Sequence, residues 1–179
     1  IKHSNKSIFL DRDGTLIKAI KKSKTKYRPP YSKKELKIYN DIKFLKFFSK
    51  NYFLIICTNQ PDIKRGLQTK TFDNFINKKI KQILPIEEIF SCECLKTEKN
   101  CNCYKPKTTM ILKAKKKYKI NLKKSYVIGD TWRDISLGQN TGCKTILVDR
   151  GQNEIIMKKN KFKPDFIIKN LKNLKKIIN

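Results

Sequence analysis

The sequence has no apolar run long enough to cross a membrane. Its longer stretches of consecutive apolar residues, such as residues 52–57 and 126–128, have the length of strands, whereas a bilayer span needs roughly 20 residues. The start of the chain also lacks the charged-then-apolar pattern of a secretory leader. We therefore expect a cytoplasmic protein with no membrane partner. The 179 residues suit one domain that covers residues 1–179.

Acidic residues, arginine and alanine are scarce. The 15 Asp and Glu residues face 43 Lys and Arg residues, and the formal net charge of +28 is typical of proteins that bind polyanions. However, 38 of the basic residues are Lys and 5 are Arg, while Ile numbers 25 and Ala 2. Selection for base or phosphate recognition would favour arginine forks. We favour a general compositional preference for Lys and Ile, with a polyanion-binding surface as the alternative.

The distribution of the lysines favours the same interpretation. Lysines run through nearly every segment instead of gathering on one helix, as at Lys21, Lys22, Lys43, Lys78, Lys79, residues 115–117, Lys158 and Lys159. Nucleic acid is therefore not the partner that we expect.

Short apolar runs predict strands, and helical patterns follow most of them. The predicted strands are residues 7–10, 53–57, 126–128 and 145–148, and they end at Asp11, Thr58, Gly129 and Asp149. This alternation predicts a Rossmann-like α/β fold, a three-layer sandwich with a central parallel sheet. Open parallel sheets bind their ligands at the carboxyl ends of the strands. We expect the functional site there.

Apolar residues at helical spacing predict four helices, and their apolar faces are expected to pack in the core. One helix buries Ile42, Leu45 and Phe48, and a fourth begins after Asp130 and ends near Gly142. The other two carry longer apolar faces: Phe72, Phe75, Ile76, Ile80 and Ile83, ending before Pro85, and Met110, Ile111, Ala114 and Tyr118. The polar, proline-containing stretch of residues 21–32 is expected to be a loop beside the active site.

The strongest local signal is the segment Phe-Leu-Asp-Arg-Asp-Gly-Thr at residues 9–15, directly after a predicted strand. Asp11 and Asp13 would repel each other unless a cation or a shared proton lies between them. Gly14 allows a tight turn whose backbone N–H groups can approach a phosphate oxygen. A surface turn or a Ca²⁺ loop is the alternative, although the later acceptors of a Ca²⁺ loop are missing.

Three further elements follow in order along the chain. Thr58 offers a hydroxyl to a phosphoryl oxygen, and Lys105, before a rigid proline, offers a positive charge. Asp130 and Asp134 offer a metal carboxylate and a second carboxylate that supports it. Each is commonplace alone, but together they supply what phosphoryl transfer needs, because charge stabilisation carries most of that catalysis.

Four segments resemble motifs of the haloacid dehalogenase superfamily, and they extend over almost the whole chain. They are residues 9–16 (FLDRDGTL), 58–66 (TNQPDIKRG), 101–107 (CNCYKPK) and 127–134 (VIGDTWRD). Within the superfamily the pattern is most similar to the bacterial D-glycero-D-manno-heptose 1,7-bisphosphate 7-phosphatases and the histidinol-phosphate phosphatases.

The resemblance implies a role for each matching residue. Asp11 would be the nucleophile and Asp13 the general acid and base, and Thr58 and Lys105 would stabilise the phosphoryl group. Mg²⁺ would bind Asp11, the carbonyl oxygen of Asp13, and Asp130. Six further residues of these motifs are predicted to bind substrate: Arg12, Asn59, Gln60, Arg65, Tyr104 and Thr131.

Four of the six cysteines form a second pattern, at Cys92, Cys94, Cys101 and Cys103. Two close pairs of thiolates across a short loop suit a tetrahedral Zn²⁺ site, and a pair of disulfides is the alternative. Similar phosphatases bind structural zinc in this loop, usually with a histidine at the second position. Here the single histidine, His3, is far away in sequence, so we expect an all-cysteine site that fixes the loop at about residues 92–103 beside Lys105.

Two features of the sequence bear on the substrate. Tyr104 stands where the resemblance leads us to expect a basic residue, and the segment after Thr15 is longer and more Lys-rich than in similar enzymes. The motif spacing leaves no room for a cap domain, so we expect a capless monomer. The favoured activity removes the 7-phosphate of heptose 1,7-bisphosphate, in the synthesis of precursors of lipopolysaccharide. The alternatives are a histidinol-phosphate phosphatase, a nucleic-acid 3′-end phosphatase, and a zinc-stabilised binding module without activity.

Overall fold

The computed structural model of the chain describes residues 5–23, 26–151 and 163–178. His3, Lys158 and Lys159 lie outside these ranges.

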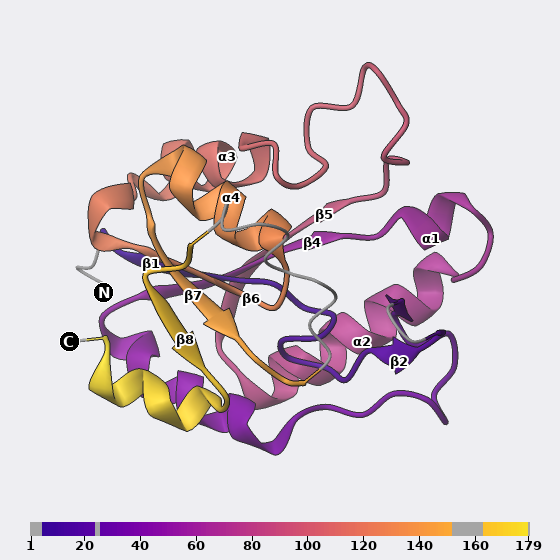
Figure 1. Cartoon of the computed structure of the whole chain (residues 1–179), viewed down its shortest axis with the longest axis horizontal. Coiled ribbons are helices and arrows are strands. Elements are labelled where there is room, and N and C mark those ends of the chain that lie inside the picture. Colours follow the sequence, from indigo (N-terminus) through magenta and orange to yellow (C-terminus); the bar gives the residue numbers. More distant parts are fainter. Residues whose placement is uncertain (1–4, 24–25, 152–162, 179) are drawn as a thin grey trace.

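Within the described residues, six parallel strands form one sheet in the order β5-β4-β1-β6-β7-β8 (Figure 1). Their bounds are β1 Ser7–Leu10, β4 Phe53–Asn59, β5 Ile86–Cys92, β6 Tyr126–Gly129, β7 Lys144–Val148 and β8 Phe166–Ile168. From β1 the chain runs to one side through β4 and β5, and it then returns to the other side of β1 as β6. The carboxyl ends of β1, β4 and β6 therefore flank the topological switch point, where such sheets form their ligand crevice.

Successive residues of the central strands pack on opposite faces of the sheet, and both faces are apolar. In β1, Ile8 and Leu10 belong to one hydrophobic cluster and Phe9 to the other. Leu54 and Ile56 of β4 likewise join the first cluster, and Ile55 the second. Strands covered on both faces read as continuous apolar runs, which is why residues 7–10 and 53–57 could be predicted as strands.

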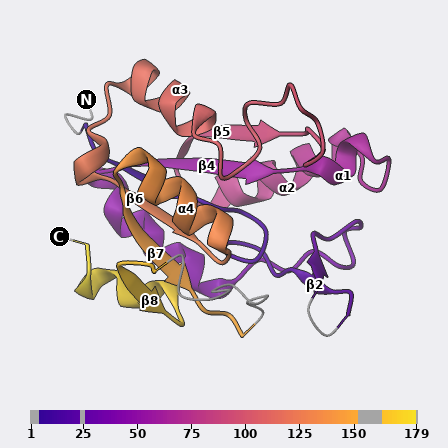
Figure 2. The same ribbon diagram turned by 45° about the horizontal axis from the view of Figure 1, so that its top comes forward.

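Helices cover each face of the sheet (Figures 1 and 2). The helices are α1 Pro61–Lys64, α2 Lys70–Ile83, α3 Thr109–Tyr118 and α4 Trp132–Thr141, and the 3₁₀ segments are η1 Asn40–Lys50, η2 Leu122–Lys124 and η4 Leu171–Lys176. Residues of α3 and α4 pack in one cluster, and residues of α2, η1 and η4 pack in the other. These three layers confirm the predicted sandwich.

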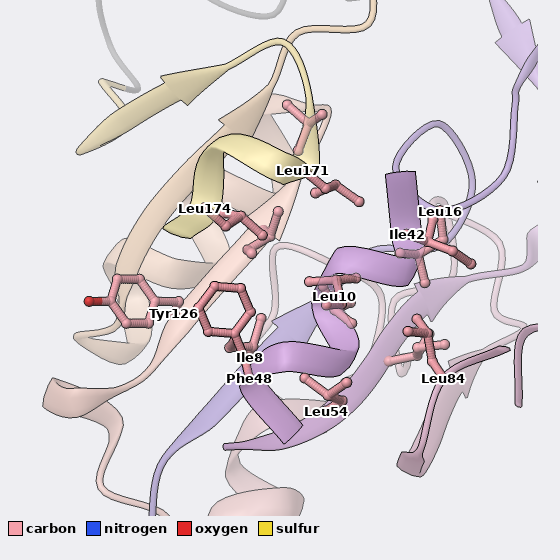
Figure 3. Packing of buried hydrophobic residues seen from close by; sticks show 14 of the residues in the cluster. Ile8, Leu10, Leu16, Ile42, Phe48, Leu54, Leu84, Tyr126, Leu171 and Leu174 are labelled. Carbon is pink, nitrogen blue, oxygen red and sulfur yellow. The ribbon is translucent and has the colours of Figure 1, made fainter. Parts of the chain in front are cut away.

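The packing of the first cluster is seen in Figure 3, where Ile8 and Leu10 of β1 face Ile42 and Phe48 of η1, with Leu174 of η4 nearby. The sequence predicted an ordinary helix for η1. Its buried residues Ile42, Leu45 and Phe48 recur every three residues, which is the period of a 3₁₀ helix.

Three further details differ from the prediction. Strands β5 and β8 were not predicted: β5 is an edge strand that contains Glu87 and Glu88, and β8 has three residues. Strand β4 continues through Thr58 and Asn59, which were expected to follow it. Residues 21–32 are also not simply a loop, because β2 (Ile20–Lys21) and β3 (Tyr27–Arg28) form a small antiparallel hairpin.

Candidate active site

The segment after β1 turns sharply because Gly14 occupies its centre. Gly14 has φ of 97°, and a Cβ atom there would overlap the carboxylate of Asp130. The backbone N–H of Gly14 donates to the carbonyl of Ile17 over 2.8 Å, and the N–H of Asp11 donates to Ile128 over 2.9 Å. These bonds hold the loop against β6, so that Asp11 and Asp130 lie close together. Any larger residue than glycine would push them apart.

Three buried carboxylates and one lysine meet at the carboxyl ends of β1 and β6. The side chains of Asp11, Asp130 and Asp134 offer oxygens that lie within 4.8 Å of one another. The Nζ atom of Lys105, whose residue is 3 % exposed, lies 2.6 Å from Asp11 Oδ1 and 2.7 Å from Asp134 Oδ1. One ammonium group therefore faces three carboxylates, which leaves net negative charge in a buried place.

The electrostatics of this group favour a bound cation. Burial raises the pKa of Asp11 to about 6, with added repulsion from Asp134 and Asp13. Burial, and then the charges of Asp11 and Asp134, raise the pKa of Asp130 well above its usual value. For Lys105 burial alone would lower the pKa, but the charges of Asp11 and Asp134 outweigh it and raise the pKa. Positive charge is thus strongly favoured here.

The oxygens available to a cation suit Mg²⁺. Asp11 Oδ2 and Asp130 Oδ1 are buried and have no hydrogen-bond partner within the described residues. A buried acceptor without a partner is costly, and a hard divalent ion that prefers oxygen ligands would satisfy both atoms. Asp134 instead accepts hydrogen bonds from the N–H and hydroxyl of Thr131, over 3.1 and 2.8 Å. It is therefore fixed at the start of α4, where it orients Lys105.

One carboxylate oxygen of Asp13 accepts hydrogen bonds from neighbouring side chains, and the other has no partner among the described residues. Its Oδ2 atom accepts hydrogen bonds from Arg12 Nε over 3.2 Å and from Gln60 Nε2. The hydroxyl of Thr58 lies 3.5 Å from the same oxygen, and Oδ1 has no partner in the described structure. Asp13 also lines the cavity described below. Asp13 therefore lies beside the cavity with one buried carboxylate oxygen that has no hydrogen-bond partner in the described structure.

Two residues predicted to bind substrate have a different place in the structure. Arg12 is fully buried, and its Nη1 atom donates to Asp73 Oδ1 over 2.6 Å and to Asn77 Oδ1 over 2.8 Å. Gln60 is also buried and donates to Asp13 and to the hydroxyl of Thr58. Neither residue is among the described residues that line the cavity, and both donate hydrogen bonds to the carboxylate of Asp13.

Sequence reasoning missed Asp73 as the partner of Arg12. The signal was present, because Asp73 lies beside Phe72 on the buried side of α2, where an unpaired charge would be costly.

A cavity of about 220 Å³ opens above Asp11 and Lys105. Four residues predicted to bind substrate line it: Asn59, Arg65, Tyr104 and Thr131. Its remaining described lining residues, apart from Asp11, Asp13, Lys105 and Asp130, were not predicted: Ala19, Tyr27, Arg28, Pro29, Pro61, Asp62 and Arg133. The β2–β3 hairpin supplies several of them, which places the stretch of residues 21–32 beside the site, as expected.

Asn59 connects β4 to the segment that carries Lys105. The backbone N–H of Lys105 donates to Asn59 Oδ1 over 2.9 Å, and Asn59 Nδ2 donates to the carbonyl of Lys105 over 3.4 Å. These two hydrogen bonds hold the backbone of Lys105 at the carboxyl end of β4, the strand next to β1.

The four clustered cysteines lie together, next to the segment of Lys105. The sulfurs of Cys92 and Cys103 lie in contact, within reach of a disulfide, whereas Cys94 and Cys101 carry free thiols. All four sulfurs lie within 4.8 Å of one another, and three of the distances between them are 3.7, 3.8 and 3.7 Å. Four thiolates around a zinc ion at about 2.3 Å would be separated by about 3.8 Å. Reduced cysteines in this arrangement fit zinc.

Comparisons with known proteins agree with this fold. Residues 102–174 match a family model described as HAD-hydrolase-like. The D-glycero-alpha-D-manno-heptose-1,7-bisphosphate 7-phosphatase of Campylobacter jejuni is 33% identical over 187 residues, which cover 97% of this chain and 94% of that protein. The chain therefore belongs to the haloacid dehalogenase-like family of phosphatases.

A second relative and a solved structure are also similar to the chain. The histidine biosynthesis bifunctional protein HisB of Blochmanniella floridana is 34% identical over 80% of this chain, but the match covers 41% of that protein. The crystal structure of D,D-heptose 1.7-bisphosphate phosphatase from B. bronchiseptica, complexed with magnesium and phosphate, has a TM-score of 0.80 at 22% identity and covers 96% of both chains. This second likeness concerns the fold.

No helix in the described part of the chain has both the length and the apolar character needed to cross a membrane.

Proposed function

We propose that the chain is a Mg²⁺-dependent phosphatase that removes the 7-phosphate of D-glycero-D-manno-heptose 1,7-bisphosphate. The observation that carries the proposal is the contact of buried Lys105 with Asp11 and Asp134 beside Asp130, at the floor of the cavity. The relative from Campylobacter jejuni, which matches nearly the whole chain, supports the substrate. The reaction would supply precursors of lipopolysaccharide and other cell-surface polysaccharides.

Asp11 is proposed as the nucleophile. Its carboxylate attacks phosphorus, an Asp11–phosphorus bond forms, and the bond from phosphorus to the sugar oxygen breaks. Asp13 donates a proton to the departing alkoxide. A water molecule then loses its proton to Asp13 and attacks phosphorus, which releases inorganic phosphate and restores the Asp11 carboxylate.

Lys105 places a full positive charge next to the nucleophile, 2.6 Å from Asp11 Oδ1. Phosphoryl transfer spreads negative charge over the equatorial oxygens, so a fixed ammonium group stabilises the transition state. Thr58 is proposed to offer its hydroxyl to a phosphoryl oxygen, and in this structure it also supports Asp13. Asn59, Arg65, Tyr104 and Thr131 are proposed to contact substrate, because they line the cavity.

Asp11 and Asp130, with the carbonyl oxygen of Asp13, are proposed to hold Mg²⁺. The unpartnered oxygens Asp11 Oδ2 and Asp130 Oδ1 support this assignment. When bound, the ion would neutralise the clustered carboxylates and the phosphoryl oxygens. Asp134 would act through Lys105 and Thr131 instead of binding the ion.

Zinc is proposed as a structural ion on Cys92, Cys94, Cys101 and Cys103. The three sulfur distances near the edge length of a ZnS₄ tetrahedron support it. The ion would fix the loop that precedes Lys105, while Cys57 and Cys143, both buried with free thiols, would take no part.

We further propose that residues 1–179 act as one capless domain, as a monomer in the cytoplasm. The described residues support a single unit, because one sheet joins both sides of the site. Histidinol phosphate is the second candidate substrate, favoured by the likeness to HisB.

A panel of phosphorylated substrates tests the proposed activity. Purified protein with Mg²⁺ is assayed for phosphate release from heptose 1,7-bisphosphate, histidinol phosphate and a 3′-phosphorylated oligonucleotide. We expect the bisphosphate to have the highest kcat/KM by at least about tenfold, which corresponds to roughly 1.4 kcal/mol of transition-state binding. A higher kcat/KM for histidinol phosphate would reassign the substrate, and no turnover of any phosphate ester would reject the enzyme.

A further inference from the structure

The few arginines of this chain gather at the cavity. Three of the five, Arg28, Arg65 and Arg133, line it, whereas among its described lining residues Lys105 is the single representative of 38 lysines. A random draw from the basic residues would have given lysines. Arginine carries a planar fork of donors that matches phosphate, so its concentration here indicates anion recognition beyond the reacting phosphate.

Arg28 is held rigidly on the β2–β3 hairpin. Its Nη1 and Nη2 atoms donate to the two carboxylate oxygens of Glu35 over 2.9 and 2.7 Å. Its Cζ atom also lies 4.3 Å from the centroid of the Tyr31 ring. The Nε atom of Arg28 donates no hydrogen bond to another described residue. Arg28 is thus fixed in direction and still has donor capacity.

Arg65 is tied to the same structure from the other side. Tyr31 donates its hydroxyl to Asp62 Oδ2 over 2.8 Å, and Arg65 Nη1 donates to Asp62 Oδ1 over 2.8 Å. The contacts therefore run in one chain from Arg28 through Tyr31 and Asp62 to Arg65. The other nitrogens of Arg65 face no carboxylate among the described ion pairs.

A buried contact fixes the hairpin segment against the loop after α1. Gln68 Nε2 donates to the carbonyl of Pro30 over 2.7 Å, and both residues are buried. The segment of residues 27–35 and the segment of residues 61–68 consequently form one wall of the cavity. The hairpin and α1 lie toward the same side of the molecule in both views of the ribbon (Figures 1 and 2).

Arg133 has a different position. It follows Asp130 by three residues, at the start of α4, and its charge acts to lower the pKa of Asp130. It therefore lies near Asp130, while Arg28 and Arg65 belong to the segments of residues 27–35 and 61–68.

We propose that Arg28 and Arg65 bind the second phosphate of a bisphosphorylated sugar whose other phosphate reacts at Asp11. This inference rests on the proposed function and names the residues that select its substrate. Tyr104 offers no charge at the cavity, so Arg28 of the hairpin and Arg65, directly after α1, supply it. A substrate with one phosphate leaves the donors that Arg28 and Arg65 do not share with Glu35 and Asp62 without a phosphate partner, and the site discriminates against it.

The test compares two substrates in three variants. Arg28→Ala and Arg65→Ala are assayed with Mg²⁺ on heptose 1,7-bisphosphate and on p-nitrophenyl phosphate, which has a single phosphate. Lys22→Ala is the control, because it removes one charge from the same hairpin at an exposed residue that does not line the cavity. The readout is the ratio of the two kcat/KM values, with KM and kcat recorded separately.

For each arginine variant we expect this ratio to fall on the order of 10²-fold, mainly through a higher KM for the bisphosphate, the scale of one lost charge-assisted contact. Lys22→Ala should keep the wild-type ratio, and Arg28→Lys should recover part of it. An equal loss on both substrates would indicate a merely structural role and overturn the inference, as would an unchanged ratio.

The outcome also separates this inference from the proposed function. A wild-type enzyme that hydrolyses p-nitrophenyl phosphate but shows no preference for the bisphosphate would reject the proposed substrate, and the inference with it. A wild-type preference that both arginine variants retain would overturn the inference alone.

Discussion

At the scale of single residues, the two aspartates of the loop after β1 differ in what surrounds them. Asp11 contacts Lys105 and lies close to Asp130, whereas Asp13 is held by Arg12 and Gln60. We predict that Asp11→Asn abolishes turnover and weakens Mg²⁺ binding, because an amide neither attacks phosphorus nor neutralises the ion. Asp13→Asn should also stop turnover but leave Mg²⁺ binding largely intact. Steady-state kinetics and calorimetric titration with Mg²⁺ check both, and near-normal activity in Asp11→Asn would show that the nucleophile is another residue.

The raised pKa values of the same carboxylates predict how Mg²⁺ binding depends on pH. Burial raises the pKa of Asp11 to about 6 in the metal-free protein, so a proton occupies this group increasingly as the pH falls below 6. Mg²⁺ must displace that proton, and we expect its apparent affinity to fall by about tenfold per pH unit below pH 6 if one proton is displaced. Titrations at several pH values measure this. The dependence should weaken in Asp11→Asn, where Asp130 is the remaining proposed ligand with a raised pKa. An affinity independent of pH between 5 and 7 in the unmodified protein would contradict the prediction.

At the scale of elements, the loop after β1 depends on α2. The buried guanidinium of Arg12 pairs with Asp73 over 2.6 Å, and no water-exposed surface is available to it. Asp73→Asn leaves a buried cation with Asp13 and Asn77 as its partners, so we expect a loss of about 3 kcal/mol in the free energy of unfolding, the low end of the range for a broken buried pair. Urea denaturation of the variant measures it. Glu93→Gln, which breaks an exposed contact with Lys70, is the control and should cost at most about 1 kcal/mol.

The cysteine loop is the second element on which the site depends. Protein purified under reducing conditions should contain about one zinc ion per chain, because four thiolates hold zinc strongly and Mg²⁺ poorly. Cys101→Ser should lower the melting temperature and kcat together, since the loop leads directly to Lys105. Elemental analysis and thermal denaturation test this. Absence of zinc, combined with cluster cysteines that do not react with a thiol reagent, would favour disulfides.

The sequence could predict those residues of the candidate site that directly follow a strand. Asp11 and Asp130 follow apolar strands, and parallel strands bring their carboxyl ends to one edge of the sheet. The direction of neighbouring side chains could not be predicted as well: Arg12 lies between Asp11 and Asp13 in sequence, yet it points toward α2 and away from the cavity. Successive side chains of an extended segment point to opposite sides, and the partner that decides between them, Asp73, is 61 residues away.

The position of Arg28 at the cavity could not be predicted from the sequence for a related reason. It enters the cavity because the β2–β3 hairpin pairs it with Ile20 and because Glu35 and Tyr31 fix its side chain. Two-residue strands give no periodic signal, and the surrounding Lys-rich composition resembles a solvated loop. Long-range docking, through contacts such as that of Gln68 with Pro30, decides the position of this hairpin.

At the scale of the whole molecule, the net charge of +28 comes mainly from lysines, and the described ones other than Lys105 do not line the cavity. Its described lining contains Lys105 and three arginines, while the other lysines that the structure describes lie elsewhere. If the charge is compositional, a small substrate contacts few of these cations, and salt should affect it weakly. A nucleic acid that spans several phosphates would instead release counterions and bind with a steep salt dependence.

We predict that kcat/KM for heptose 1,7-bisphosphate falls by less than about fivefold between 50 and 200 mM salt, because screening acts on few contacts. A single-stranded oligonucleotide that contacts about five phosphates would lose on the order of 10²-fold in binding over the same interval. Both substrates are assayed at the two salt concentrations, with the oligonucleotide carrying a 3′-phosphate. A higher kcat/KM for the oligonucleotide together with the steep dependence would mean that the lysines form the substrate surface, and that their number reflects function rather than composition.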